Sequence, residues 1–115
     1  MSFESLEVWK RSARLSATLY QKTKAIKDYG FRDQLTRSGL SIPSNIAEGF
    51  ERGSRAEIAR FLTIAKGFAG EAITQIYIGS EADYLDREEG KRWIQELKEI
   101  SAMLGALIRK YRAKD

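Results

Sequence analysis

Apolar residues recur every three to four positions along almost the whole chain of 115 residues, and only short breaks separate the periodic segments. This spacing is typical of helices that bury one face. No segment alternates apolar and polar residues at the period of a β-strand. The pattern therefore predicts an all-α protein.

Caps and breaks divide the chain into four expected helices. Ser5 is the expected N-cap of the first helix, and Ser54-Arg55-Ala56-Glu57 is a capping box that opens the third. The expected helices span Leu6–Ile26, Phe31–Phe50, Ser54–Ala82 and Asp86–Arg112. Helices of similar length joined by short loops favour antiparallel neighbours. We predict a single domain over residues 1–115, an up-down-up-down antiparallel four-helix bundle.

Each expected helix carries an apolar stripe that predicts its core face. In the third helix the stripe comprises Ile58, Phe61, Leu62, Ala65, Ala69, Ala72, Ile73, Ile76 and Tyr77. In the fourth it comprises Trp93, Leu97, Ile100, Leu104, Leu107, Ile108 and Tyr111. For the first helix we assign Leu6, Trp9, Ala13, Ala17 and Tyr20 to the core.

A second apolar stripe lies roughly opposite the first on the first helix. It comprises Val8, Leu15, Leu19 and Ile26, and the third helix carries Ile64 and Phe68 outside its main face in a similar way. A four-helix bundle has one interior, so we predict that these six residues form a subunit interface. The alternative is that they are scattered surface aliphatic residues, which are common.

Pro43 lies within the second expected helix, in the segment Ser41-Ile42-Pro43-Ser44-Asn45-Ile46-Ala47-Glu48-Gly49. The apolar phase continues through it, because Leu35, Ser38, Ile42, Ile46 and Gly49 share one face. We therefore expect a kinked helix rather than a break. Ser41, Ser44 and Asn45 are expected to bond the freed carbonyl groups, with contact to a ligand as the alternative.

The sequence resembles the small proteins encoded within intervening sequences of bacterial 23S ribosomal RNA genes. The resemblance rests on Phe3-Glu4-Ser5-Leu6-Glu7-Val8-Trp9-Lys10, on the proline segment with Pro43, Asn45, Glu48 and Gly49, and on Glu57, Phe61-Leu62 and Ala65-Lys66-Gly67. It covers nearly the whole chain. In one departure, Phe68-Ala69-Gly70 precedes Glu71 where the family pattern has a serine before the glutamate.

The resemblance implies a four-helix bundle that assembles as a homo-oligomer, a pentameric ring, as in related accessory proteins of diversity-generating retroelements. Those relatives are basic and are associated with a reverse transcriptase and nucleic acid. The resemblance therefore implies RNA, DNA or a nucleic-acid-processing protein as a partner. It implies a function only by association.

The composition argues against an enzyme. The chain has no histidine and no cysteine, so it lacks the commonest general base, the commonest metal ligand and every thiolate site. Glu48, Glu57 and Glu71 lie on the central helices, but di-iron bundles need Glu-x-x-His pairs. We predict no catalytic residue, no metal and no cofactor.

Basic residues are the candidate contacts to a nucleic-acid backbone. The chain carries a net charge of +4 and has a pI of about 9.4. Lys91, Lys98 and Arg109 form a stripe away from the apolar face of the fourth helix, and Lys110, Arg112 and Lys114 follow them. A second group comprises Arg11, Arg14 and Lys22. Such clusters neutralise phosphates, although a merely solvated surface explains them equally well.

The sequence thus predicts a non-catalytic, self-associating scaffold that binds RNA or DNA through basic helix faces. The alternative is a protein-interaction adaptor without affinity for nucleic acid. No apolar run approaches the ~20 residues of a membrane span, and no signal peptide is recognisable, so we expect a cytoplasmic protein. Membrane association through the first helix is a weaker alternative.

Overall fold

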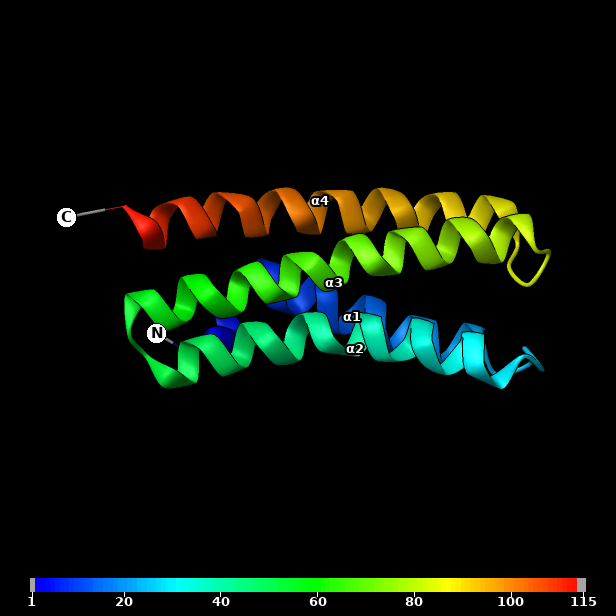
Figure 1. Ribbon diagram of the computed structural model, residues 1–115, viewed down its shortest axis with the longest axis horizontal. Coiled ribbons are helices and arrows are strands. Elements are labelled where there is room, and N and C mark those ends of the chain that lie inside the picture. Colours follow the sequence, from blue (N-terminus) through cyan, green and yellow to red (C-terminus); the bar gives the residue numbers. More distant parts are fainter. Residues whose placement is uncertain (1, 114–115) are drawn as a thin grey trace.

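The computed structural model describes residues 2–113, which form four α-helices and one short 3-10 helix. The 3-10 helix spans Phe3–Ser5 and is followed by α1 (Glu7–Lys22), α2 (Tyr29–Arg52), α3 (Arg55–Glu81) and α4 (Arg87–Arg112). Successive helices run antiparallel, and the two ends of the chain lie at the same end of the bundle (Figure 1). The predicted all-α four-helix bundle is confirmed.

Side-chain caps fix where three of the helices begin. Ser54 accepts a hydrogen bond from the Glu57 backbone N–H, as the capping box predicts, and Asp86 accepts one from the Glu89 N–H. Asp28 caps α2, which therefore begins two residues earlier than expected. At its other end, α2 stops at Gly53, whose φ of 85° favours glycine.

The prediction of Ser5 as the N-cap of the first helix is wrong. Leu6 occupies the N-cap position without a side-chain hydrogen bond, and Ser2 caps the preceding 3-10 helix instead. The helix also ends at Lys22, four residues before its expected end. Ile26 therefore lies in the connection to α2, where it is still buried.

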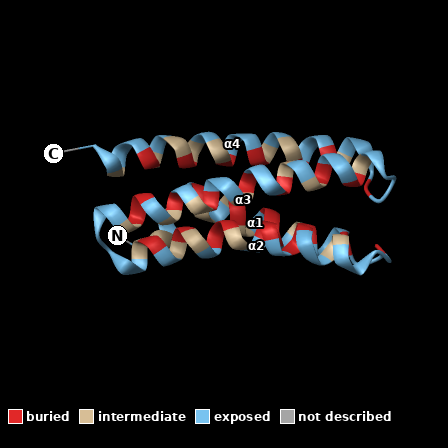
Figure 2. Ribbon diagram, viewed as in Figure 1, coloured by how far each residue is buried: buried red, intermediate tan, exposed pale blue. Residues whose placement is uncertain are grey.

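The core runs along the inner faces of all four helices (Figure 2). The predicted stripe of α2 is buried throughout, and so are most of the predicted core residues of α3 and α4. Tyr77 is an exception, since it is 59% exposed on the outer side of α3. The helix pairs α2–α3 and α3–α4 pack along most of their length, whereas α1 and α4 meet over a much smaller area.

The two faces of α1 are the reverse of the prediction. Val8, Leu15 and Leu19 are buried in the core, and so is Ile26 beyond the helix. Of the residues assigned to the core, Leu6, Trp9 and Ala13 are half-buried, whereas Ala17 and Tyr20 are exposed. The aliphatic stripe buries more apolar surface than a stripe built on alanines, and a tyrosine keeps its hydroxyl in water at little cost.

The helix α2 passes through Pro43 without interruption. The Ser41 hydroxyl donates to the Arg37 carbonyl at 2.8 Å, and the Asn45 amide donates to the Ser41 carbonyl at 2.7 Å. These two bonds do not reach the Gly39 carbonyl, which would have accepted the N–H that proline lacks. Pro43 itself is buried against α1, so its ring contributes to packing.

Candidate nucleic-acid interface

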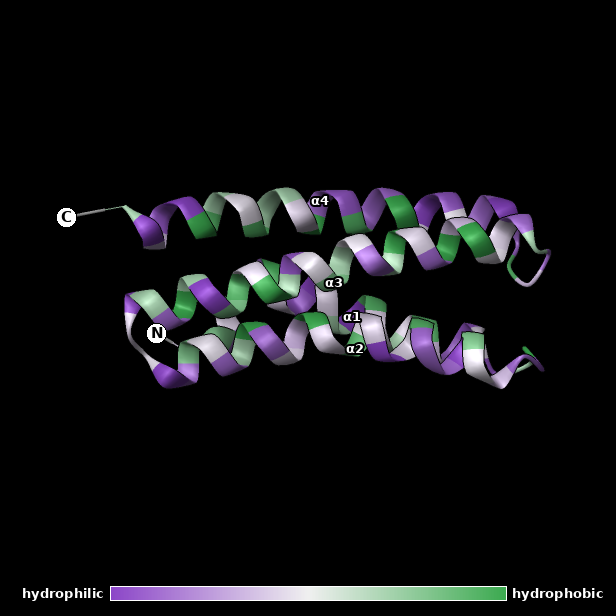
Figure 3. Ribbon diagram, in the orientation of Figure 1, coloured by the Kyte–Doolittle hydropathy of each residue, from purple (hydrophilic) through white to green (hydrophobic). Residues whose placement is uncertain are grey.

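The basic stripe predicted on α4 is exposed to solvent. Lys91, Lys98 and Arg109 all project from the surface, and hydrophilic residues recur along α4 to its C-terminal end (Figure 3). Lys91 forms an ion pair with Glu88 at 3.4 Å, in which both side chains are largely exposed. Such a pair contributes little and exchanges readily, so Lys91 remains able to meet an anion.

The last turns of α4 lie beside the first turns of α3, where the structure adds contacts that the sequence did not predict. Arg55 Nη2 donates to the Lys110 carbonyl at 2.6 Å and to the Ala113 carbonyl at 3.4 Å, so it caps the C-terminus of α4. Arg112 Nη2 donates to Thr63 Oγ1 at 3.2 Å. Lys114, the remaining predicted contact of this group, lies outside the described residues.

Between these helix ends lies a cleft of about 520 Å³. Its lining residues are Arg55, Ala56, Ala59, Arg60, Tyr111, Arg112 and Ala113. Three arginines thus border the cleft, and only alanines and one tyrosine complete its lining. Arg60 pairs with Glu57 at 3.3 Å, and its side chain is 61% exposed. We name this feature the arginine cleft.

Aromatic rings lie among these cations and are covered by them. The Arg55 Cζ lies 5.1 Å from the centroid of the Tyr111 ring, and the Lys110 Nζ lies 5.5 Å from it. The Arg60 Cζ lies 4.9 Å from the Phe61 ring centroid. These cation–π contacts hold the cationic groups in place.

Lys66 and Arg109 continue the basic surface from the arginine cleft along the seam between α3 and α4. A Cβ atom added to Gly105 would lie 3.7 Å from Lys66 Cε and 3.5 Å from Arg109 Nη1. Both side chains therefore reach over the same glycine, one from each helix. The two cationic side chains therefore approach each other across the α3–α4 seam.

The two ends of the α3–α4 pair carry opposite charge. At the end with the chain termini, residues 55–66 and 105–112 hold Arg55, Arg60, Lys66, Arg109, Lys110 and Arg112 against Glu57 alone. At the other end, residues 81–89 hold Glu81, Asp83, Asp86, Glu88 and Glu89 against Arg87 alone. Within the α3–α4 pair, positive charge is thus concentrated at the first of these ends.

Sequence reasoning missed Arg55, Arg60 and Lys66 as members of this surface. The predicted antiparallel topology contained the necessary signal, because it places the start of the third helix beside the end of the fourth. The predicted basic stripes lay on the fourth helix and the first. The three missed residues lie on the third helix.

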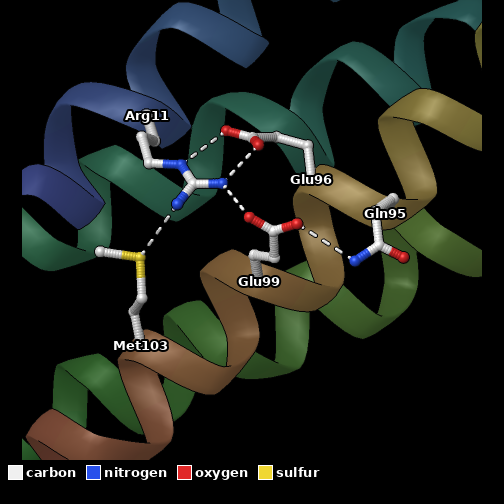
Figure 4. Close-up of polar contacts among 5 residues, drawn as sticks. All are labelled: Arg11, Gln95, Glu96, Glu99 and Met103. Carbon is white, nitrogen blue, oxygen red and sulfur yellow. Dashed lines mark hydrogen bonds and ion pairs between the residues drawn. The ribbon is translucent and has the colours of Figure 1, made fainter.

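The Arg11 guanidinium is bound by two carboxylates of α4, which argues against a role in phosphate binding. Its Nη2 lies 2.5 Å from Glu96 Oε1 and 2.6 Å from Glu99 Oε1, and its Nη1 points to the Met103 sulfur at 3.7 Å (Figure 4). The hydrogen bonds to the two carboxylates raise the pKa of Arg11 above its ordinary value. Arg11 therefore ties α1 to α4 across their sparse contact.

The other two residues of this group lie on the surface of α1. Lys22 pairs with Glu89 at 3.6 Å, which links it to the acidic end of α4. Arg14 is exposed and borders a shallow pocket with Leu15 and Trp93. Neither residue joins the basic surface of the α3–α4 pair.

The six residues predicted to form a subunit interface do not share one exposed face. Val8, Leu15, Leu19 and Ile26 belong to the core, so their assignment to an exposed stripe is wrong. Ile64 and Phe68 are half-buried, and Phe68 packs against the core. Their contact with another subunit stays a prediction.

An apolar groove of about 360 Å³ follows the outer side of α1 and α2 instead. It is lined by Phe3, Trp9, Ala13, Ser16, Leu40, Pro43, Ser44 and Ala47. Leu40 is 45% exposed there. The groove thus unites residues from the two motifs that carry the family resemblance, the N-terminal segment and the proline segment.

The three central carboxylates form separate surface contacts. Glu48 pairs with Arg52 at 3.0 Å, Glu57 pairs with Arg60, and Glu71 accepts a hydrogen bond from Ser38 at 3.1 Å. Among residues 2–113, no group of three or more potential metal ligands comes together. None of the described helices has the combination of length and apolar character that a membrane crossing requires.

Comparison with known proteins connects this geometry to a family. The chain is similar to a crystal structure of a protein with unknown function from the S23 ribosomal protein family, from Bacteroides thetaiotaomicron. The two share 25% identity with a TM-score of 0.82, over 89% of this chain and 95% of that one. No curated protein matches the sequence. The family model described as 23S rRNA-intervening sequence protein matches residues 4–106, and the chain therefore belongs to the 23S rRNA-intervening sequence protein family.

Proposed function

We propose that this protein is a non-catalytic bundle that binds the phosphate backbone of RNA or DNA. The observation that carries the proposal is the concentration of six cations against one carboxylate where α3 begins and α4 ends. Cations that neutralise phosphates release condensed counterions, which gives a salt-dependent affinity that is largely independent of sequence. Lys91 and Lys98 extend the same helix surface towards its other end.

The test compares the wild type with a variant that carries Lys91→Glu, Lys98→Glu and Arg109→Glu. A matched control carries Lys10→Glu, Lys24→Glu and Lys27→Glu, which make the same charge change at exposed positions outside α3 and α4. Binding to a structured RNA and to a DNA duplex is measured across a salt series. We expect steep salt dependence for the wild type, a large loss for the α4 variant and a smaller loss for the control.

Two results would contradict the proposal. The absence of binding at low salt would remove the nucleic-acid function and leave the adaptor alternative. An equal loss in both variants would show that net charge matters rather than the α3–α4 surface. The circular dichroism spectrum of each variant reports whether the helices are retained.

We further infer that the protein acts as a homo-oligomer, for which the family resemblance implies a ring of five subunits. Oligomerisation would multiply the charge of +4 on each chain. The apolar groove between α1 and α2 supports self-association, because half-exposed Leu40 and half-buried Trp9 lie in it together. The same groove supports the adaptor alternative, in which it holds a different protein.

Light scattering after size exclusion separates these possibilities. We expect the wild type to form a defined oligomer and Leu40→Glu to shift it towards monomer, with Ala17→Glu as an exposed control on α1. A monomeric wild type would contradict self-association. An oligomer that survives Leu40→Glu and dissociates with Phe68→Glu would instead place the interface at the residues predicted on α3.

A further inference from the structure

We propose that the arginine cleft selects single-stranded over double-stranded nucleic acid and holds the strand by its phosphates. This inference rests on the proposed function, and it names the form of nucleic acid that the site accepts. It follows from three features of the cleft: its recessed shape, the position of its cations, and the contacts that already cover its aromatic rings.

The first feature is the shape of the cleft. Ala56 and Ala59 on α3 and Ala113 beyond α4 are small, so the cations stand around a recess of about 520 Å³ instead of on a convex surface. A duplex is stiff, with a persistence length of about 150 base pairs, and deforming it costs free energy. A single strand bends freely and can follow a recess between two helices. The shape therefore favours a single strand.

The second feature is the position of the cations. Arg60 and Arg112 both line the cleft, and Arg112 is oriented by its hydrogen bond to Thr63 on α3. Beyond them, Lys66 and Arg109 reach over Gly105. From Arg60 to Lys66 the rise along α3 is about 9 Å. These four cations thus mark a short linear track.

Arg55 has a different role in this track. Its guanidinium caps the C-terminus of α4 through the Lys110 and Ala113 carbonyl groups. It therefore holds the two walls of the cleft together and acts as a positioning residue. The expected phosphate contacts are Arg60, Lys66, Arg109 and Arg112.

The third feature is that the aromatic rings already have partners. Arg55 and Lys110 lie over the Tyr111 ring, and the Phe50 ring meets it edge-on with centroids 5.5 Å apart. Arg52 and Arg60 lie over the Phe61 ring. Bases stack on open aromatic faces in proteins that read single strands, and these faces carry cations instead. The strand is therefore held by its phosphates with little sequence preference.

The experiment uses fluorescence anisotropy with an RNA and a DNA single strand of about 12 nucleotides, each of mixed sequence, and the matching duplexes. The full chain is compared with a variant carrying Arg60→Gln and Arg112→Gln and with a control carrying Lys24→Gln and Lys27→Gln. Each protein is measured between about 50 and 200 mM salt, so that the slope of log K against log salt is obtained.

We expect the wild type to bind both single strands more tightly than the duplexes. In the cleft variant, the slope for single strands should fall by about 1.4, because each lost phosphate contact removes about 0.7. The control should keep the wild-type slope. An unchanged thermal midpoint shows that the cleft variant remains folded.

Three outcomes would overturn the inference, and the first two leave the proposed function standing. Duplexes bound as tightly as single strands would remove the selectivity and leave backbone binding intact. Single-strand binding that the cleft variant retains in full would place the site elsewhere on the surface. Salt-dependent binding to neither form would contradict both this inference and the proposed function.

Discussion

The Cα of Gly49 in α2 faces Phe61 in α3 so closely that a methyl group on Gly49 would lie 2.9 Å from the Phe61 Cβ. The same methyl group would lie 3.3 Å from the Ile58 Cα. Both neighbours are backbone or near-backbone atoms, which cannot move aside as the end of a flexible side chain can. The glycine of the proline segment therefore sets how closely α2 and α3 approach.

Gly49→Ala should destabilise the protein by about 1–3 kcal/mol, because the added methyl group overpacks this contact. Gly67→Ala is the matched control, since nothing lies within 4 Å of the Cβ position there. That change should stabilise the helix by up to about 1 kcal/mol through helix propensity alone. Urea unfolding measures the change in the free energy of unfolding for both variants. A Gly49→Ala protein as stable as the wild type would show that α2 and α3 can move apart at no cost in free energy.

Leu19→Ala should lower the free energy of unfolding by about 2–5 kcal/mol, because Leu19 is 0% exposed and its loss leaves a cavity. Replacing Leu15 and Leu19 together with glutamate should abolish the cooperative fold, since two charges would be buried. Ala17→Glu changes an exposed position of the same helix and should stay within about 0.5 kcal/mol of the wild type. If the double glutamate variant instead forms soluble, helical monomers, Leu15 and Leu19 lie in a subunit interface and not in the core.

The reversed faces of α1 show what periodicity leaves open. The spacing of Leu15 and Leu19 and the spacing of Trp9, Ala13 and Tyr20 both satisfy the helical pattern. Which of the two stripes is buried depends on how α1 packs against the neighbouring helices, and the spacing of residues along one helix does not report that packing. In α3 and α4 most predicted core residues are buried, because neither helix offers a competing continuous stripe.

The arginine cleft was partly within reach of the sequence. Antiparallel topology brings Arg60 of α3 near Arg112 of α4, and the topology was predicted correctly. The pattern left open the rotation of α1 about its axis, which decides that Arg11 meets Glu96 and Glu99. It also does not fix the contacts of long surface side chains such as Arg112, which reaches Thr63.

Stability should depend on pH through Glu99. The hydrogen bond from Arg11, followed by that from Gln95, lowers the pKa of Glu99 below its ordinary value. The folded state therefore prefers the ionised carboxylate, and the resulting stabilisation is present above the ordinary pKa of glutamate. It is lost as the pH falls through the lowered pKa.

Arg11→Gln tests this link between α1 and α4. The variant should unfold at a lower temperature than the wild type at neutral pH, and the difference should shrink in acid, where Glu99 is protonated in both proteins. Arg14→Gln, an exposed position on the same helix, is the control. A difference between Arg11→Gln and wild type that stays constant down to strongly acidic pH would mean that Arg11 stabilises by packing alone.

Asp28 joins the α1–α2 connection to the α3–α4 connection at the end of the bundle away from the chain termini. Its Oδ1 accepts from the Phe31 backbone N–H and so caps α2, and its Oδ2 accepts from the Tyr84 hydroxyl at 3.0 Å. The hydrogen bond to Asp28 raises the pKa of Tyr84 above its ordinary value. The stabilisation from this bond is therefore present below the ordinary pKa of tyrosine and is lost as the pH rises through the raised pKa.

Asp28→Ala should cost about 0.5–2 kcal/mol, because it removes the cap of α2 together with the bond to Tyr84. Tyr84→Phe removes only the second bond and should be the milder change. In an ultraviolet titration of the tyrosines, both variants should lack the phenol with the raised pKa. If a phenol with a raised pKa persists in Tyr84→Phe, the hydroxyl of Tyr84 is not bound to Asp28 in solution, and the link between the two loops rests on the edge-on contact of Tyr84 with Phe31.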